Sequence, residues 1–205
     1  MQKYEDTIVN RLAKEVAKTF GGTHVPVGMD GDFYEYYAKV EVKETSSFPA
    51  YAINLYKNGF GSTKDKVEVD IAPLKIDPDV NRSGLPFPRA GFNINRDFQA
   101  LCSGISKRVV NCPEALAALK EYQTRLDALN SRRQGLEGHM SELKNACPSI
   151  QFSTNYKKGD TTVRIFSYTG NSANGTLYSD GFIAFDYINS INMDKAQRIL
   201  NILAE

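Results

Sequence analysis

The sequence has no tryptophan, only two histidines and three cysteines, and no long apolar run. A run of roughly 20 apolar residues is needed to cross a bilayer, so no membrane-spanning helix is expected. His24 and His139 have no cysteine or carboxylate nearby at metal-ligand spacing. The chain also lacks a Gly-x-Ser-x-Gly nucleophile elbow and a phosphate-binding loop. We therefore expect a protein that is not an enzyme and that carries no metal and no cofactor.

The charges nearly cancel, at a formal net charge of +1, so any phosphate-binding surface must gather its positive charge locally. Hydrophobic residues make up 41% and charged residues 24% of the chain, which is typical of a globular protein. The first 20 residues mix Lys, Glu and Asp among apolar positions, unlike a signal peptide. The few cysteines suit a reducing compartment. These features favour a cytoplasmic protein that is neither secreted nor bound to a membrane.

The residue pattern in the first half of the chain predicts several strands between two helices. Apolar residues recur at helical spacing over 6–20, and Gly21-Gly22 ends that segment. Alternation of apolar and polar residues, typical of strands with one buried face, occurs in 34–43, 50–57, 66–72 and 91–94. A second helix is expected over 95–109, with Asn95 as its N-cap.

The longest predicted helix covers residues 113–146. Its apolar residues fit a heptad pattern, in which Leu119 and Tyr122 begin the two apolar positions. Gly135 and Gly138 weaken it, and whether it is continuous or a hairpin stays open. Packing within its own domain is favoured over a dimerisation zipper, because Arg133 occupies a heptad core position.

The last part of the chain returns to strands, at 150–156, 161–168, 176–178 and 181–185, and ends in a helix over 193–204. Both halves thus contain several antiparallel strands and then a helix, which indicates a duplicated unit. We expect an α+β fold in three segments, 1–112, 113–148 and 149–205, packed as one compact domain. The segment 113–148 would connect the two sheet-plus-helix units.

Three motifs between residues 50 and 110 carry a family resemblance. They are the strand 67–71, with sequence Val-Glu-Val-Asp-Ile, the loop that opens with Asp77-Pro78, and the segment 89–95, with sequence Arg-Ala-Gly-Phe-Asn-Ile-Asn. This region resembles the single-stranded-DNA-binding domain of the positive-cofactor-four transcriptional coactivators. Whirly proteins carry the same strands-then-helix unit twice in one chain. The resemblance implies a Whirly-like fold that binds single-stranded DNA or RNA across its sheets.

Single-stranded bases stack on exposed aromatic rings that lie beside cations. In the strand 161–168, Arg164, Phe166 and Tyr168 share one face if Val163 and Ile165 face the core. We expect non-enzymatic binding of single-stranded RNA or DNA. Bases would stack on Tyr56, Phe60, Phe166 and Tyr168, and phosphates would be held by Lys57, Lys64, Lys66, Arg82, Arg89, Lys157, Lys158 and Arg164.

A protein-binding module, such as an inhibitor or an assembly factor, is the alternative. Tyrosines serve well as interface anchors, because they supply contact area and a hydrogen bond together. The acidic stretch 30–44 suits a basic protein partner better than a phosphate chain. Whether the protein binds RNA or DNA, and whether it forms a homo-oligomer, stays open at this point.

Overall fold

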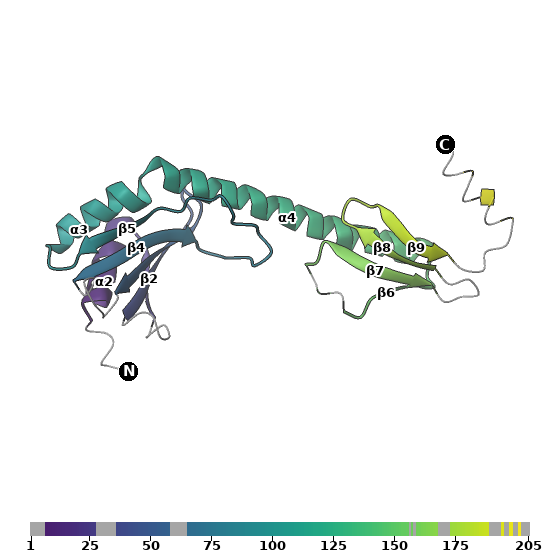
Figure 1. Ribbon diagram of the computed structural model, residues 1–205, viewed down its shortest axis with the longest axis horizontal. Coiled ribbons are helices and arrows are strands. Elements are labelled where there is room, and N and C mark those ends of the chain that lie inside the picture. Colours follow the sequence, from purple (N-terminus) through teal and green to yellow (C-terminus); the bar gives the residue numbers. More distant parts are fainter. Residues whose placement is uncertain are drawn as a thin grey trace. The chain divides into compact units, whose positions relative to one another are not determined.

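The computed structural model describes residues 7–27, 36–57, 65–155, 157, 159–167, 173–188, 194, 197, 198 and 201. The chain divides into two compact units, Met1–Leu126 (unit 1) and Asp127–Glu205 (unit 2). The border falls inside the long helix α4 (Pro113–Ala146), whereas the sequence analysis placed borders at its two ends. Each unit contains an antiparallel sheet (Figure 1), and the predicted α+β class is confirmed.

Unit 1 contains a five-stranded antiparallel sheet whose strands follow one another in chain order. They are β1 (Thr23–Val27), β2 (Tyr36–Val42), β3 (Tyr51–Lys57), β4 (Lys66–Pro73) and β5 (Arg89–Asn93). In β4, Val67, Val69 and Ile71 are buried, while the residues between them are partly exposed, as the alternation predicts. The strand β1 was not predicted, because the sequence Thr-His-Val-Pro-Val lacks a clear apolar–polar alternation.

Helix α2 (Ile8–Phe20) begins at Thr7, whose hydroxyl accepts the backbone N–H of Asn10, and ends at Gly21, where φ is 64°. Helix α3 (Phe98–Ile105) continues into the π-helical turn η2 (Ser106–Val110). The N-cap of α3 is Asp97. The prediction that Asn95 caps this helix is therefore wrong. The Asp97 carboxylate accepts the backbone N–H groups of Gln99 and Ala100, the second and third residues of α3, and its negative charge is favourable at a helix N-terminus.

The core of unit 1 lies on one face of its sheet. Buried side chains from α2, α3, η2 and the start of α4 pack there against β2, β3, β4 and β5. Tyr122 of α4 is 2% exposed, and its hydroxyl accepts the backbone N–H of Asp77 at 2.9 Å and donates to the carbonyl of Lys75 at 3.3 Å. Tyr122 therefore attaches the loop between β4 and β5 to α4.

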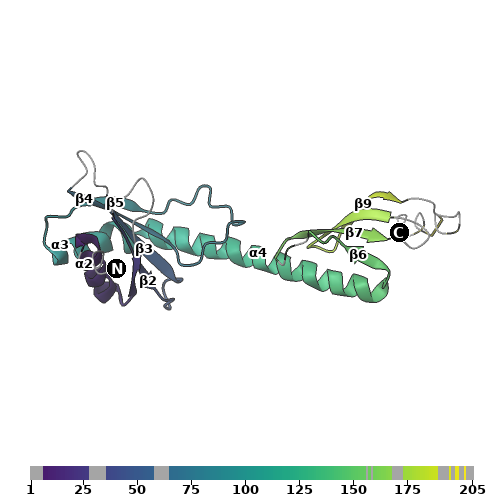
Figure 2. The same cartoon turned by 90° about the horizontal axis from the view of Figure 1, so that it is seen from below.

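Unit 2 contains a four-stranded antiparallel sheet, in the order β6 (Ile150–Phe152), β7 (Thr162–Ser167), β8 (Ala173–Tyr178) and β9 (Ile183–Ile188). The second half of α4 runs along one face of this sheet (Figure 2). Its core is small: the buried cluster consists of Leu136, Ile150, Val163, Ile165 and Leu177.

Helix α4 is a single helix of 34 residues, so the hairpin left open by its two glycines is not formed. A Cβ atom at Gly135 would lie 2.7 Å from the carbonyl oxygen of Ser179, whereas one at Gly138 would meet nothing within 4 Å. Gly135 is therefore required for the close approach of α4 to the turn after β8.

The second predicted unit is only partly comparable with the first. Its predicted last helix, 193–204, lies mostly outside the described residues, although Asp194, Gln197, Arg198 and Asn201 are helical and exposed. The duplication therefore stays a prediction. Within the described ranges, no helix combines the length and the apolar character that crossing a bilayer requires.

Candidate functional site

The face of the unit 1 sheet that points away from α2 carries aromatic, polar and charged side chains. Strand alternation places them there, because their neighbours in sequence are core residues. We call this surface the open sheet face; it consists of Tyr37, Lys39, Glu41, Asn54, Tyr56, Lys66, Glu68, Asp70 and Arg89.

A row of hydrogen bonds crosses three strands of the open sheet face. The Tyr37 hydroxyl donates to Oδ1 of Asn54 at 2.9 Å, and Nδ2 of Asn54 donates to Oδ1 of Asp70 at 2.8 Å. Asn54 is only 8% exposed, so its polar atoms need these partners. Burial raises the pKa of Asp70, although the Asn54 hydrogen bond and Arg89 oppose that shift. This row fixes the orientation of the polar side chains.

Two tyrosines on this face form a flat aromatic surface. The rings of Tyr37 and Tyr56 stack with centroids 4.9 Å apart and an interplanar angle of 19°. The guanidinium carbon of Arg89 lies 5.9 Å from the Tyr56 ring centroid. Stacked rings next to a guanidinium are the kind of surface on which an unpaired base could stack.

The charges of the open sheet face are balanced. Arg89 forms an ion pair with Glu68, and the Lys39 ammonium lies 2.7 Å from the Glu41 carboxylate. Asp70, near the centre of the face, adds a further carboxylate. Because nucleic-acid affinity depends mainly on cations that neutralise phosphates, this balance weakens the attraction of the face for a phosphate chain.

The structure brings together three of the predicted unit 1 residues, Tyr56, Lys66 and Arg89, on the open sheet face. Lys57 is aligned with the buried Val67 and lies on the opposite side of the sheet from Tyr56. Arg82 is exposed in the loop between β4 and β5. The predicted residues Phe60 and Lys64 lie outside the described residues.

In unit 2, Arg164 and Phe166 share one face of β7, as the alternation predicts, because Val163 and Ile165 are buried. The Arg164 guanidinium forms an ion pair with Asp186 of β9. Lys157 is exposed between β6 and β7. The remaining predicted residues of this unit, Lys158 and Tyr168, lie outside the described residues.

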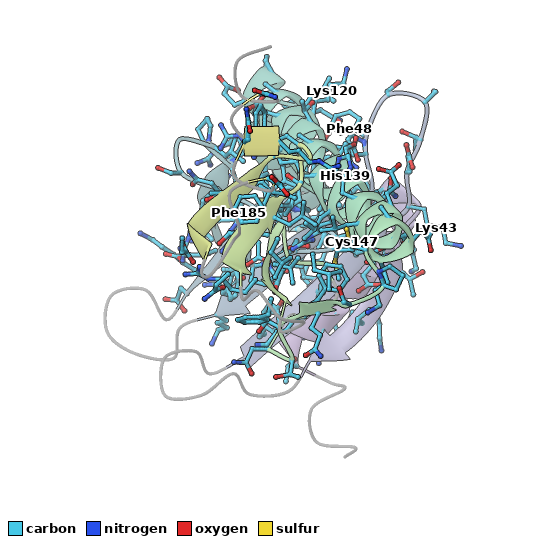
Figure 3. The ribbon with its side chains drawn as sticks, turned by 90° about the vertical axis from the view of Figure 1, so that its right-hand side faces the viewer. Lys43, Phe48, Lys120, His139, Cys147 and Phe185 are labelled. Carbon is cyan, nitrogen blue, oxygen red and sulfur yellow. The ribbon has the colours of Figure 1, made fainter. Side chains whose placement is uncertain are left out.

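The turn and strands around β8 and β9 expose large apolar side chains. Tyr178 is 40%, Phe182 73% and Phe185 53% exposed, and we call these three residues the hairpin surface. Among the described residues, only Ile76 of unit 1 is a further large apolar side chain with comparable exposure. Figure 3 labels Phe185 on β9, together with His139 of α4 and Cys147, which directly follows α4.

A cavity of about 200 Å³ lies next to the hairpin surface. Phe185 lines it together with Leu143 of α4, Cys147 directly after α4, and the apolar side chains of Ile150, Ile165 and Ile183. Phe185 therefore connects the cavity to the protein surface, and such a cavity is of the kind into which an apolar side chain of another molecule inserts. Tyr178 follows the buried Leu177 and lies on the other face of the sheet.

No protein-family model matches the chain. Neither curated proteins nor solved structures gave a match. The resemblance to the positive-cofactor-four and Whirly folds therefore stays a prediction. Within the described ranges, no group of three or more His, Cys, Asp or Glu side chains is placed to hold a metal ion.

Sequence reasoning missed the hairpin surface. Phe182 follows the turn residues Asp180-Gly181, and an apolar aromatic residue directly after a turn is a signal that could have indicated exposure. The pattern of residues 181–185 predicts a strand but does not indicate which face of that strand is covered. Ile165 and Phe185 are both aligned with Gly175, so Phe185 lies on the same face of the sheet as the core residue Ile165. Phe185 belongs to the edge strand β9, however, and is exposed there.

Proposed function

We propose that the protein is a non-enzymatic protein-binding module that holds its partner at the hairpin surface of unit 2. The observation that carries this proposal is Phe185, which is 53% exposed and lines an apolar cavity, on a hairpin that also exposes the aromatic side chains of Tyr178 and Phe182. Aromatic side chains are enriched among the residues that dominate binding energy at protein interfaces.

Exposure of this apolar area to water is unfavourable, by roughly 25 cal/mol for each Å² left uncovered. Scattered exposed apolar residues are common on protein surfaces, but contiguous ones mark interaction sites. Phe185 lies on the same face of β9 as Ile183 and continues the apolar lining of the cavity to the protein surface, while Phe182 is exposed in the turn before β9. The hairpin surface therefore gains stability when a partner covers it.

The chemistry of the partner follows from the residues between the aromatic rings. Asp180, which is exposed, lies in the turn between Tyr178 and Phe182. The partner is then a protein segment with an aliphatic or aromatic side chain for the cavity and a Lys or Arg that faces Asp180. The other carboxylate of this region, Asp186, forms an ion pair with Arg164 and is therefore neutralised within the sheet.

The test compares three forms of the protein as immobilised bait: the unchanged chain, the double variant Phe182→Ser/Phe185→Ser, and the control Ile76→Ser. Ile76 and Phe185 have the same exposed fraction, 53%, but Ile76 belongs to unit 1. A captured protein is purified and its affinity for each form is measured. We expect at least a tenfold weaker affinity for the double variant, about 1.4 kcal/mol or more, and an unchanged affinity for Ile76→Ser.

Equal affinity for the unchanged chain and the double variant would contradict the proposal, as would an equal loss with Ile76→Ser. Ionic strength supplies a second criterion. An interface centred on aromatic side chains keeps most of its affinity when salt rises, whereas a phosphate-binding interface loses affinity steeply.

Binding of single-stranded nucleic acid on unit 1 is the second candidate function. One observation favours it, the stack of Tyr37 and Tyr56 beside Arg89 on the open sheet face. Fluorescence anisotropy with labelled single-stranded RNA and DNA tests it at low and moderate salt. Binding that is lost in Tyr56→Ala but kept in Ile76→Ser would favour this candidate, and no binding at tens of micromolar would remove it.

A further inference from the structure

A depression of about 440 Å³ lies on the helical side of unit 1, where α2, β1 and the start of α3 meet. Helix α2 supplies Arg11, Lys14 and Lys18 at positions i, i+3 and i+7, which lie along one side of a helix. The other two elements supply His24 of β1 and Phe98 of α3. These residues come from segments far apart in the sequence, so the fold alone assembles them.

His24 is held in place at this depression by a buried amide. Its Nε2 atom donates to Oδ1 of Asn10 at 3.0 Å, and Asn10 is only 3% exposed. Because Nε2 carries the hydrogen, the neutral imidazole takes up its second proton at Nδ1. The ring is therefore oriented by the core of the unit and is not free to rotate away.

The depression carries a surplus of positive charge. Three permanent cations line it, against the single carboxylate of Glu15, which the Lys18 ammonium approaches to 2.7 Å. The pKa of His24 is lowered, first by partial burial and then by the positive charge of Lys14. The positive charge of Lys14 is therefore close enough to His24 to oppose its protonation, and an anion bound there would meet the same charge.

We propose that this depression binds a phosphate group, with Arg11, Lys14 and Lys18 as its charged ligands and His24 as a hydrogen-bonding one. Arginine and lysine are the usual phosphate ligands, and Phe98 supplies an apolar wall for the group that carries the phosphate. The site lies on the opposite side of the sheet from the open sheet face, and it uses no residue of the open sheet face or of the hairpin surface.

The charged groups near His24 set the sign of the expected effect. Helix α2 contributes the three cations and Glu15. The carboxylate of Asp97, the cap of α3, is engaged with the N–H groups of its own helix. Glu41 is aligned with Thr23 and so lies on the other face of the sheet from His24. A bound phosphate adds negative charge, favours the imidazolium and raises the pKa of His24.

The experiment is an NMR titration of the two histidines in the full chain, in chloride and in inorganic phosphate at equal ionic strength. His139 of unit 2 is the internal control. In phosphate, we expect the pKa of His24 to rise by about half a unit or more, while that of His139 stays unchanged. A shift of His24 no larger than that of His139 would overturn the proposal without the use of any variant.

Two double variants that remove the same amount of charge test whether the rise in the His24 pKa comes from phosphate bound at this depression. Arg11→Gln/Lys14→Gln removes two ligands, whereas Lys43→Gln/Lys120→Gln removes two exposed lysines elsewhere in unit 1, both labelled in Figure 3. In chloride, the first variant has a higher His24 pKa than the unchanged chain, because Lys14 no longer opposes protonation. In phosphate, its further rise is at most about a third of the original one. An undiminished rise in this variant would contradict the site.

The phosphate group can belong to a small molecule or to a nucleic-acid backbone, and the titration separates these sources. A nucleoside monophosphate and a short single-stranded oligonucleotide are compared with inorganic phosphate at equal ionic strength. Affinity at least tenfold higher for the oligonucleotide assigns the site to a nucleic-acid backbone. Equal or higher affinity for the monophosphate assigns it to a small phosphorylated molecule.

Discussion

Unit 1 and unit 2 are both helix-on-sheet arrangements, but they cover their apolar surfaces to different degrees. In unit 1, four helical segments bury one face of the sheet, and the other face carries paired charges and hydrogen-bonded polar groups. In unit 2, half of one helix covers a smaller sheet, and Phe182 and Phe185 stay exposed among the described residues. Within the described residues, unit 2 therefore leaves more large apolar side chains uncovered than unit 1 does, and this uncovered surface is where the proposed partner would bind.

The largest expected effect comes from the loss of a buried leucine in each core. Leu136→Ala in unit 2 and Leu55→Ala in unit 1 each remove a side chain with 0% exposure, at a cost of about 3 kcal/mol. We expect unit 2 to unfold in the first variant, because its core is small. Unit 1 stays folded in the second. Hydrogen exchange of backbone amides measures the unfolding of each unit separately. If unit 1 unfolded in Leu55→Ala while unit 2 stayed folded in Leu136→Ala, the comparison between the two units would be reversed.

A moderate effect is expected at the glycines of α4. Gly135→Ala places a methyl group against the carbonyl of Ser179 and destabilises unit 2 by about 1–2 kcal/mol, in spite of the better helix propensity of alanine. Gly138→Ala, where there is open space, stabilises the same helix by about 0.5–1 kcal/mol. Thermal unfolding of the two variants checks the opposite signs. Equal effects would show that helix propensity, and not the close approach, decides stability there.

The smallest effect concerns the open sheet face of unit 1. The folded-state pKa of Asp70 is raised by burial, so the folded protein binds this proton more tightly than the unfolded chain does. The ionised carboxylate therefore lowers stability above the folded-state pKa, and this cost disappears as the pH falls below it. We expect Asp70→Asn to raise the free energy of unfolding at pH 7 and to leave it unchanged in acid. Urea denaturation of both proteins at pH 7 and in acid measures this free energy. An equal gain in the free energy of unfolding at both pH values would contradict the raised pKa of Asp70.

Much of the fold could be predicted because local patterns determine it. The strands β3 and β4 begin and end within one residue of the predicted bounds, since alternation marks the residues that face the core. The N-cap of α3 was assigned to Asn95 and is Asp97. Asn95 and Asp97 lie two residues apart and both belong to residue types that cap helices, so the sequence pattern does not show which of them the first turn engages.

The candidate sites were less predictable, because they depend on contacts between distant segments. Alternation correctly placed Arg164 and Phe166 on one face of β7. It could not show that Asp186, on another strand, neutralises Arg164, or that Glu68 does the same for Arg89. The depression lined by α2 and His24 was not predicted for the same reason, because only the packing of β1 against α2 brings His24 next to the cations of that helix.

The three cysteines have a consequence for measuring how each unit opens. All are free thiols: Cys102 is buried in the core of unit 1, Cys112 is half-buried and Cys147 is exposed in unit 2. Burial also raises the pKa of the Cys102 thiol, which lowers its reactivity further. An alkylating reagent then modifies Cys147 at the rate of an accessible thiol, whereas it modifies Cys102 through the transient opening of unit 1. The ratio of the Cys102 rate to that of a model thiol gives the population of that opened state in native buffer, with no denaturant added.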